Sequence, residues 1–141
     1  MINLFSWKIS NEEIKRQVDN YDNLRITESF RGTSVLLILG SIILTIVLAI
    51  FNVISYSTLL YGVIMYLPIA YFIWRGHRWA IITAICLWTL DKGYQFFTVS
   101  SGYVPIIIWW VLFASCFYNT LRIENIRRLK IKIKDNKIEN K

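Results

Sequence analysis

A charged pair stands inside an otherwise apolar stretch of the chain. Asp91 and Lys92 are adjacent, and Gln95 follows Asp91 by about one helical turn. A carboxylate beside an ammonium group can bind an ion, hold a proton or neutralise its neighbour. A charged side chain within a membrane helix costs at least about 2–3 kcal/mol by insertion scales, so it marks a pathway or a packing contact. Asp91, Lys92 and Gln95 therefore form a candidate polar site, with Tyr61 as a neighbour expected at similar depth.

Three interpretations of this pair stay open. Successive helical residues point about 100° apart, so Asp91 and Lys92 are not expected to face each other, and each needs a further partner. In a structural role, the two charges largely neutralise each other, Lys92 reaches outward, and hydroxyl or amide donors hold Asp91. In a transport role, the pair lines an ion or proton path, within one subunit or between two. Catalysis has the least support, because no nucleophile or metal site stands beside the pair.

The elements that must position this pair are long apolar runs. Four runs of 19 to 22 residues cover 33–54, 56–74, 79–99 and 103–121. About 20 apolar residues cross the hydrocarbon core of a bilayer. In lipid every backbone donor and acceptor must be paired within its own segment, so each run must be helical. The sequence predicts an all-α membrane protein built on a four-transmembrane-helix bundle.

The distribution of basic residues predicts the topology. Of the 16 Lys and Arg residues, five precede the first run, two lie in the connection 75–78, and eight follow the fourth run. The other two connections carry no charge. The positive-inside rule then places both termini and the 75–78 connection in the cytoplasm. We expect an N-terminal segment over 1–32, a membrane domain over 33–121 and a basic tail over 122–141. More Ile and Lys than Ala suggests an AT-rich genome, and the short connections suggest a bacterial inner membrane.

The two terminal segments have their own patterns. Ser10 and Glu13 have the spacing of a capping box, which predicts a short amphipathic helix from Asn11 to about Asn20. This helix is expected on the membrane face or against the bundle, and a solvated leader is the alternative. Beyond 121 the fourth helix is expected to continue briefly. The alternation of Lys and Ile over 130–134 then predicts an edge strand or an extended segment, and 135–141 a free end.

Basic residues near the inner membrane surface are expected to contact lipid phosphates. Each is worth about 1 kcal/mol of attraction to anionic lipid. The tail therefore has anionic lipid as its expected partner, and a cytosolic protein is the alternative. No motif for nucleic-acid binding is present. The predicted headgroup contacts are Arg75, His77, Arg78, Arg127, Arg128, Lys130, Lys132 and Lys134.

The motifs that name an activity are missing from the sequence. There is no nucleotide loop, nucleophile elbow or zinc-protease motif, and His77 is the single histidine, so no cofactor or metal site is expected. The first hypothesis is a non-enzymatic membrane anchor or regulatory subunit that meets a partner through its cytoplasmic ends. The second is a homo-oligomeric channel, transporter or membrane-permeabilising protein that uses Asp91 and Lys92. So small a bundle is expected to form a homo-oligomer or to join a larger membrane complex.

Overall fold

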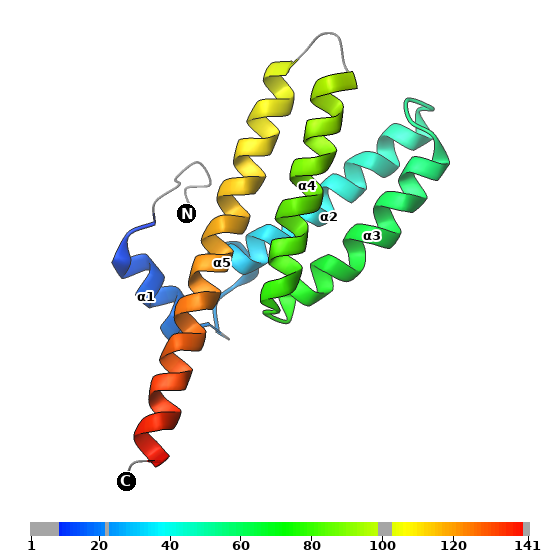
Figure 1. The fold of residues 1–141 in the computed structure, drawn as a ribbon. Coiled ribbons are helices and arrows are strands. Elements are labelled where there is room, and N and C mark those ends of the chain that lie inside the picture. The colour runs from blue at the N-terminus through cyan, green and yellow to red at the C-terminus, as the bar shows by residue number, and fades with distance from the viewer. Residues whose placement is uncertain (1–8, 22, 99–102, 140–141) are drawn as a thin grey trace.

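The computed structural model describes residues 9–21, 23–98 and 103–139, and the side chains up to 137. Within these ranges it is all-helical (Figure 1). Its helices pair as two antiparallel hairpins, which meet through contacts of α2 with α5 and of α3 with α4. The uncharged connection expected over 100–102 lies outside the described residues. The elements are α1 (Asn11–Asp19), a 3-10 turn η1 (Ile26–Glu28), α2 (Phe30–Ile50), α3 (Tyr56–Trp74), α4 (Arg78–Thr98) and α5 (Tyr103–Glu139).

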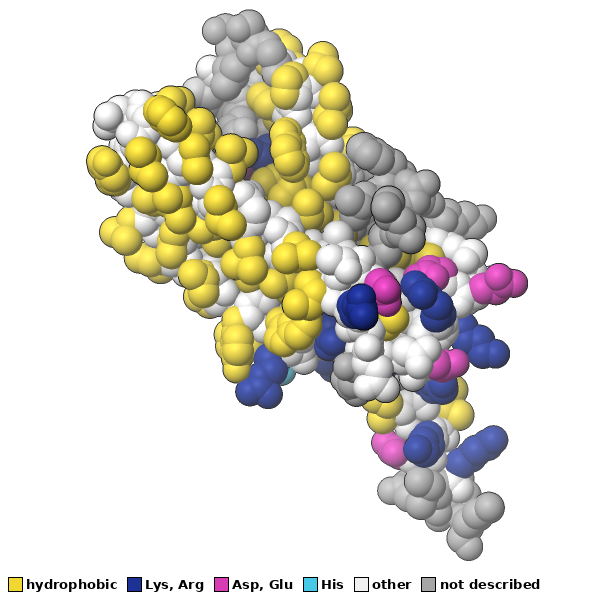
Figure 2. All heavy atoms as spheres, turned by 180° about the vertical axis from the view of Figure 1, so that it is seen from behind, with side chains coloured by type: hydrophobic (Ala, Val, Ile, Leu, Met, Phe, Trp, Pro, Cys, Tyr) yellow, Lys and Arg dark blue, Asp and Glu magenta, His cyan; other side chains and the backbone are white. Residues whose placement is uncertain are grey.

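Helices α2, α3 and α5 are long and apolar enough to cross a membrane, which is consistent with a membrane protein. Helix α4 has 21 residues, but Asp91 and Lys92 in its C-terminal half lower its hydropathy. Its crossing of the membrane stays a prediction. Figure 2 shows hydrophobic side chains over the body of the hairpins and charged ones gathered at one end. This "basic end" comprises α1, the start of α2, the α3–α4 turn at Gly76 and α5 beyond Thr120.

The helix boundaries follow from short polar signals. Ser10 Oγ accepts a hydrogen bond from the Glu13 backbone N–H at 3.2 Å, which confirms the predicted start of α1. Ser55 caps α3 in the same way. The first apolar run becomes a helix only as far as Ile50, because Asn52 adopts a left-handed φ of 55° that turns the chain toward Ser55.

Two apolar clusters hold the helices together. In the central cluster, Trp88 of α4 stacks on Phe113 of α5 with ring centroids 3.9 Å apart, over buried residues of α2 and α3. The second cluster lies at the basic end, where Ile14 and Val18 of α1 pack near Ile123 of α5. Helix α1 therefore packs against the hairpins, as one of the two sequence interpretations expected.

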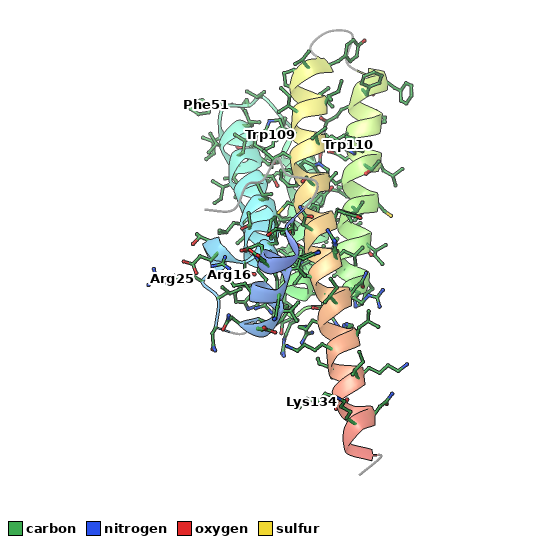
Figure 3. The ribbon with its side chains drawn as sticks, turned by 90° about the vertical axis from the view of Figure 1, so that its left-hand side faces the viewer. Arg16, Arg25, Phe51, Trp109, Trp110 and Lys134 are labelled. Carbon is green, nitrogen blue, oxygen red and sulfur yellow. The ribbon has the colours of Figure 1, made fainter. Side chains whose placement is uncertain are left out.

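Helix α5 is a single helix of 37 residues, and the strand or extended segment predicted over 130–134 is wrong. Residues 135–139, predicted as part of a free end, are helical, and the described side chains of 135–137 are exposed. A helix that has already formed gains one hydrogen bond for each residue added, and Lys is a good helix former. The alternating pattern is overridden because the described residues offer no strand to pair with. Lys134 lies on the part of α5 that projects beyond the other helices (Figure 3).

Candidate functional site

The predicted polar residues Asp91, Lys92 and Gln95 of α4 each contact the other two, and we call them the Asp91 triad. Lys92 Nζ lies 3.1 Å from Asp91 Oδ2 and donates to Gln95 Oε1 at 2.9 Å. Gln95 Nε2 donates to Asp91 Oδ2 at 3.0 Å. The expectation that Asp91 and Lys92 would not face each other is therefore wrong, because the long lysine side chain bends back along the helix.

The two charges of the triad differ in exposure. The Lys92 side chain is 15% exposed and its ammonium lies 4.7 Å from the centroid of the Trp88 ring, a cation–π contact. The Asp91 side chain is 44% exposed. Tyr61 of α3 lines the same cavity as the triad, but among the described residues no hydrogen bond joins it to them. The triad is thus a local, partly open arrangement within one helix.

The triad lies in the wall of a cleft of about 950 Å³ between the α2–α3 hairpin and α4. Aliphatic and aromatic side chains together make up most of the lining, and Trp109 and Phe113 of α5 contribute to it. Gly40 and Gly62 also line the cleft, and a Cβ added at either would meet no atom within 4 Å. We call this cavity "the cleft". The two glycine positions therefore border open space within the cleft.

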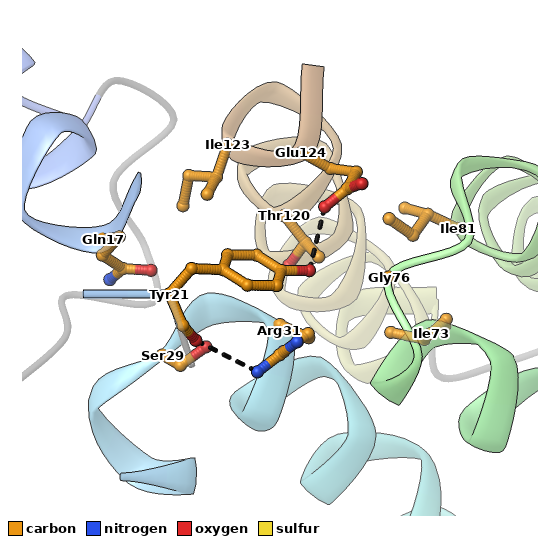
Figure 4. A pocket seen from close by; sticks show the side chains of 10 residues that line it. All are labelled: Gln17, Tyr21, Ser29, Arg31, Ile73, Gly76, Ile81, Thr120, Ile123 and Glu124. Atoms are coloured by element: carbon orange, nitrogen blue, oxygen red, sulfur yellow. Dashed lines mark hydrogen bonds between the residues drawn. The ribbon is translucent and has the colours of Figure 1, made fainter. Parts of the chain in front are cut away.

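A second polar centre, which the sequence analysis did not predict, lies at the basic end. The Glu124 residue is 1% exposed and its carboxylate accepts four hydrogen bonds. Arg127 donates two, at 3.0 and 2.8 Å, and Arg128 donates one at 2.8 Å. The Tyr21 hydroxyl donates the fourth at 2.9 Å (Figure 4). We call these four residues "the Glu124 cluster".

The Glu124 cluster connects four parts of the fold. Arg128 Nη2 donates to the Gly76 carbonyl at 3.1 Å, which links α5 to the α3–α4 turn. The Tyr21 ring lies against the guanidinium groups of Arg31 and Arg127, at 4.1 and 4.2 Å from its centroid. Arg31 also donates to the Tyr21 carbonyl at 3.2 Å. The cavity left beside these groups is about 10 Å³, roughly the space of one water molecule.

Electrostatics at the cluster favour a charged carboxylate. Burial by itself raises the pKa of Glu124, but hydrogen bonds from Arg127, Arg128 and Tyr21 outweigh it and hold that pKa below its ordinary value. Burial and the neighbouring carboxylate raise the pKa of Tyr21, so its hydroxyl stays protonated and donates. The carboxylate's hydrogen-bonding capacity is largely filled by the protein itself, which leaves little for a ligand.

Close contacts around the cluster hold the N-terminal segment in place. Gln17 is buried, donates to the Glu28 carbonyl at 3.2 Å and accepts from the Phe30 backbone N–H at 3.1 Å. A Cβ on Gly32 would lie 2.2 Å from the Ile26 carbonyl oxygen. Sequence spacing could have indicated the pairing of Glu124 with arginines three and four positions later. Nothing in the sequence alone indicated Tyr21, which is 103 residues away.

The residues predicted to contact lipid headgroups have several different environments. Arg127 and Arg128 bind Glu124, and Lys130 pairs with Asp19 of α1. Arg75 donates to the Tyr71 hydroxyl at 3.0 Å, and His77 lies against Phe72. Arg78, Lys132 and Lys134 are exposed. Contact of these residues with lipid stays a prediction.

The two polar centres differ in what they can still bind. The Asp91 triad presents a carboxylate and an ammonium group at the wall of an open cleft, whereas the Glu124 cluster is closed. In the part of the chain that the structure describes, no group of three or more His, Cys, Asp or Glu residues is placed to hold a metal ion. No family model, curated protein or solved structure matches the chain.

Proposed function

We propose that this protein is a non-enzymatic subunit of a larger assembly in a bacterial inner membrane, where it presents the end of α5 to a cytosolic partner. In this proposal α4 is a fourth span beside α2, α3 and α5. Both termini and the α3–α4 turn face the cytoplasm, because basic residues concentrate there. The basic end is then the cytoplasmic end of the molecule.

The length of α5 is the observation that carries the proposal. Its 37 residues extend about 55 Å at 1.5 Å per residue. The hydrocarbon core of a bilayer is about 30 Å thick, so one continuous helix crosses it and projects well beyond the surface. A helix that continues in the direction of its membrane segment cannot lie flat on the lipid. The projecting part therefore favours a soluble partner over the membrane surface.

The projecting helix is braced where it leaves the hairpins. Glu124 and Arg128 connect α5 to Tyr21 and to the α3–α4 turn. Lys130, two residues beyond Arg128, pairs with Asp19 of α1. Ordering entropy opposes binding by mobile segments, so a braced helix meets its partner at lower entropic cost.

One face of the projecting helix is suited to a groove. Leu129 and Ile133 are four residues apart, hence on the same face, and are 60% and 61% exposed. Lys130 and Lys134 flank them on the adjacent face. Apolar anchors at this spacing with basic flanks match a helix-in-groove interaction with an acidic partner.

The proposal is tested by site-specific photo-crosslinking in intact cells. A photoreactive residue in place of Ile133 is expected to give a discrete adduct with a cytosolic protein. The same residue in place of Ile131 is the matched control, because Ile131 is exposed on the opposite face of the helix. Replacing Lys134 by Glu is expected to weaken the Ile133 adduct by reversing charge complementarity, while the Lys130–Asp19 pair of the brace stays intact.

Either of two results would reject the partner proposal. One is equal crosslinking from positions 131 and 133, which would indicate non-specific encounters. The other is adduct formation with lipid alone, which would return the tail to the anionic-lipid role that its charge first suggested.

A channel or transporter is the second candidate, and the position of the triad in the cleft is what favours it. If several copies of the chain surround a path, Asp91 and Lys92 supply charged groups along it. Liposomes containing the purified protein are then expected to pass ions or protons, and Asp91→Asn to stop that flux while the assembly stays intact. Undiminished flux in Asp91→Asn liposomes would remove the triad from any conduction path.

A further inference from the structure

The cleft is lined mainly by hydrophobic side chains, and its length suits a membrane lipid. Its lining on α2 extends from Leu36 to Leu48, about 18 Å at 1.5 Å per residue. The hydrocarbon of one leaflet is about 15 Å thick, half of a bilayer core. Ile54 in the α2–α3 connection also lines the cleft, which therefore reaches that end of the hairpin. With α4 in the bilayer, such a space is filled by whatever the membrane supplies.

We propose that the cleft binds one phospholipid with a zwitterionic, ethanolamine-type headgroup. Lys92 binds the lipid phosphate and Asp91 binds the lipid ammonium group, while the acyl chains lie along the aliphatic wall made by α2 and α3. The headgroup is then drawn below the usual membrane surface. This site is separate from the projecting helix and does not depend on a cytosolic partner.

Charge complementarity selects this headgroup. Asp91 and Lys92 sum to zero, so a lipid head of one sign would satisfy one member of the pair and repel the other. A headgroup that carries both a phosphate and an ammonium group forms two ion pairs, one with Lys92 and one with Asp91, in place of the single Asp91–Lys92 pair. The Asp91 side chain is 44% exposed and the Lys92 side chain 15% exposed, so the carboxylate is the more accessible charge, and Gln95 hydrogen-bonds both groups.

The remaining wall of the cleft fits a lipid's apolar part. Gly40 of α2 and Gly62 of α3 leave open space where other residues would place a side chain. Ser41 and Thr45 also line the cleft, but their hydroxyls donate to carbonyls of their own helix at 2.8 Å. These donors are therefore already hydrogen-bonded and need no partner from the lipid. A second copy of the chain would bring its own Asp91–Lys92 pair to the same face, so the test below also follows the oligomeric state.

The test measures lipid retained by the full-length protein after extraction from vesicles of equal phosphatidylethanolamine and phosphatidylglycerol content. Native mass spectrometry gives the ratio of the two lipids bound. The wild-type protein is expected to retain the ethanolamine lipid preferentially. Asp91→Asn is expected to lower that ratio about tenfold, as loss of one charge-assisted hydrogen bond predicts, because the freed Lys92 then favours an anionic head. The charge-exchanged variant Asp91→Lys with Lys92→Asp is expected to restore the preference.

Filling the cleft provides an independent test with a matched control. Gly62→Leu and Gly40→Leu place a side chain into open space and are expected to lower total retained lipid severalfold without disturbing the fold. Gly93→Leu is the control, because Gly93 also has no atom within 4 Å of an added Cβ but does not line the cleft. Ile133→Ser, on the projecting part of α5, is expected to leave retention unchanged.

Three results would overturn the proposal. The first is equal retention of the two lipids by the wild-type protein. The second is equal loss of lipid in Gly62→Leu and Gly93→Leu. The third is a wild-type dimer that Gly62→Leu dissociates while bound lipid stays constant, which would assign the cleft to a second copy of the chain.

Discussion

The Glu124 cluster and the Asp91 triad are built from similar groups and do different things. Each pairs one carboxylate with a basic residue on the same helix, three or four positions away in one case and adjacent in the other. Around Glu124, however, the contacts extend to Tyr21 and to the Gly76 carbonyl, distant in sequence. The hydrogen bonds and ion pair of the triad stay within one turn of α4. The first arrangement connects distant elements, whereas the second stays within a single helix.

The sequence separation between the contacting residues therefore distinguishes a polar centre that stabilises the fold from one that is available to bind a ligand. A contact between distant segments must form when the chain folds, so its loss is felt by the whole structure. A contact within one helical turn survives in the isolated helix and contributes little to tertiary stability. The closed cluster is expected to govern stability, and the open triad to govern binding. Four measurements test this division.

The largest expected effect follows removal of the buried carboxylate. Glu124→Ala leaves two arginines near a partly buried site without their acceptor, at an expected cost of about 2–4 kcal/mol in unfolding free energy. Unfolding of the purified protein in mild detergent measures it. Asp19→Ala is the matched control, because the Asp19–Lys130 pair also links α1 to α5 but is solvent-exposed, and little change is expected. Equal losses for both variants would contradict the division.

A substitution that crowds the backbone at the basic end should give the next largest loss of stability. Gly32→Ala would place a methyl group 2.2 Å from the Ile26 carbonyl oxygen, so the backbone must move. Overpacking of this kind costs about 1–3 kcal/mol. Gly93→Ala, with open space around it, is expected to be neutral or slightly stabilising. Limited proteolysis of the N-terminal segment should accelerate in the first variant only, and similar proteolysis of both would show that the basic end is not tightly built.

Acidification should produce a smaller effect with a definite sign. The folded pKa of Glu124 lies below its ordinary value of 4.5, so its stabilisation is complete above 4.5 and is lost as pH falls through the folded pKa. The stability difference between wild type and Glu124→Gln should therefore shrink from about pH 7 to about pH 3, since the protonated acid resembles the amide. A difference that stays constant over this range would show that the carboxylate's charge is not what stabilises the cluster.

The sequence was sufficient to predict where the helices lie but not where α2 and α5 end. Apolar runs predicted the long helices, and the Ser10–Glu13 spacing predicted the start of α1, because both signals lie within the element they describe. The period-two pattern over 130–134 failed because it is a preference of exposed residues that a preformed helix overrides. The early end of α2 depended on one backbone torsion at Asn52, which hydropathy does not encode.

The same limit applies to the polar centres. Asp91, Lys92 and Gln95 were identifiable because charge in an apolar run is conspicuous. Glu124 was not, because it lies in a tail rich in charges where one more acid carries no signal. Its importance depends on Tyr21, Arg31 and Gly76 arriving from three other segments, and pairing over such distances is set by the packing of whole helices.

The smallest expected effect on stability belongs to the triad. Asp91→Asn removes an ion pair, but under the proposed four-span arrangement it also removes the cost of placing a carboxylate in the membrane, and these two changes have opposite signs. Lys92 keeps its bond to Gln95 and its contact with Trp88. The unfolding free energy should therefore change by less than about 1 kcal/mol, because polar contacts between membrane residues average about 0.6 kcal/mol. Unfolding in detergent beside Glu124→Ala measures it. A loss comparable with that of Glu124→Ala would make the triad a second structural lock, and its charges would then be held too firmly to exchange with a ligand.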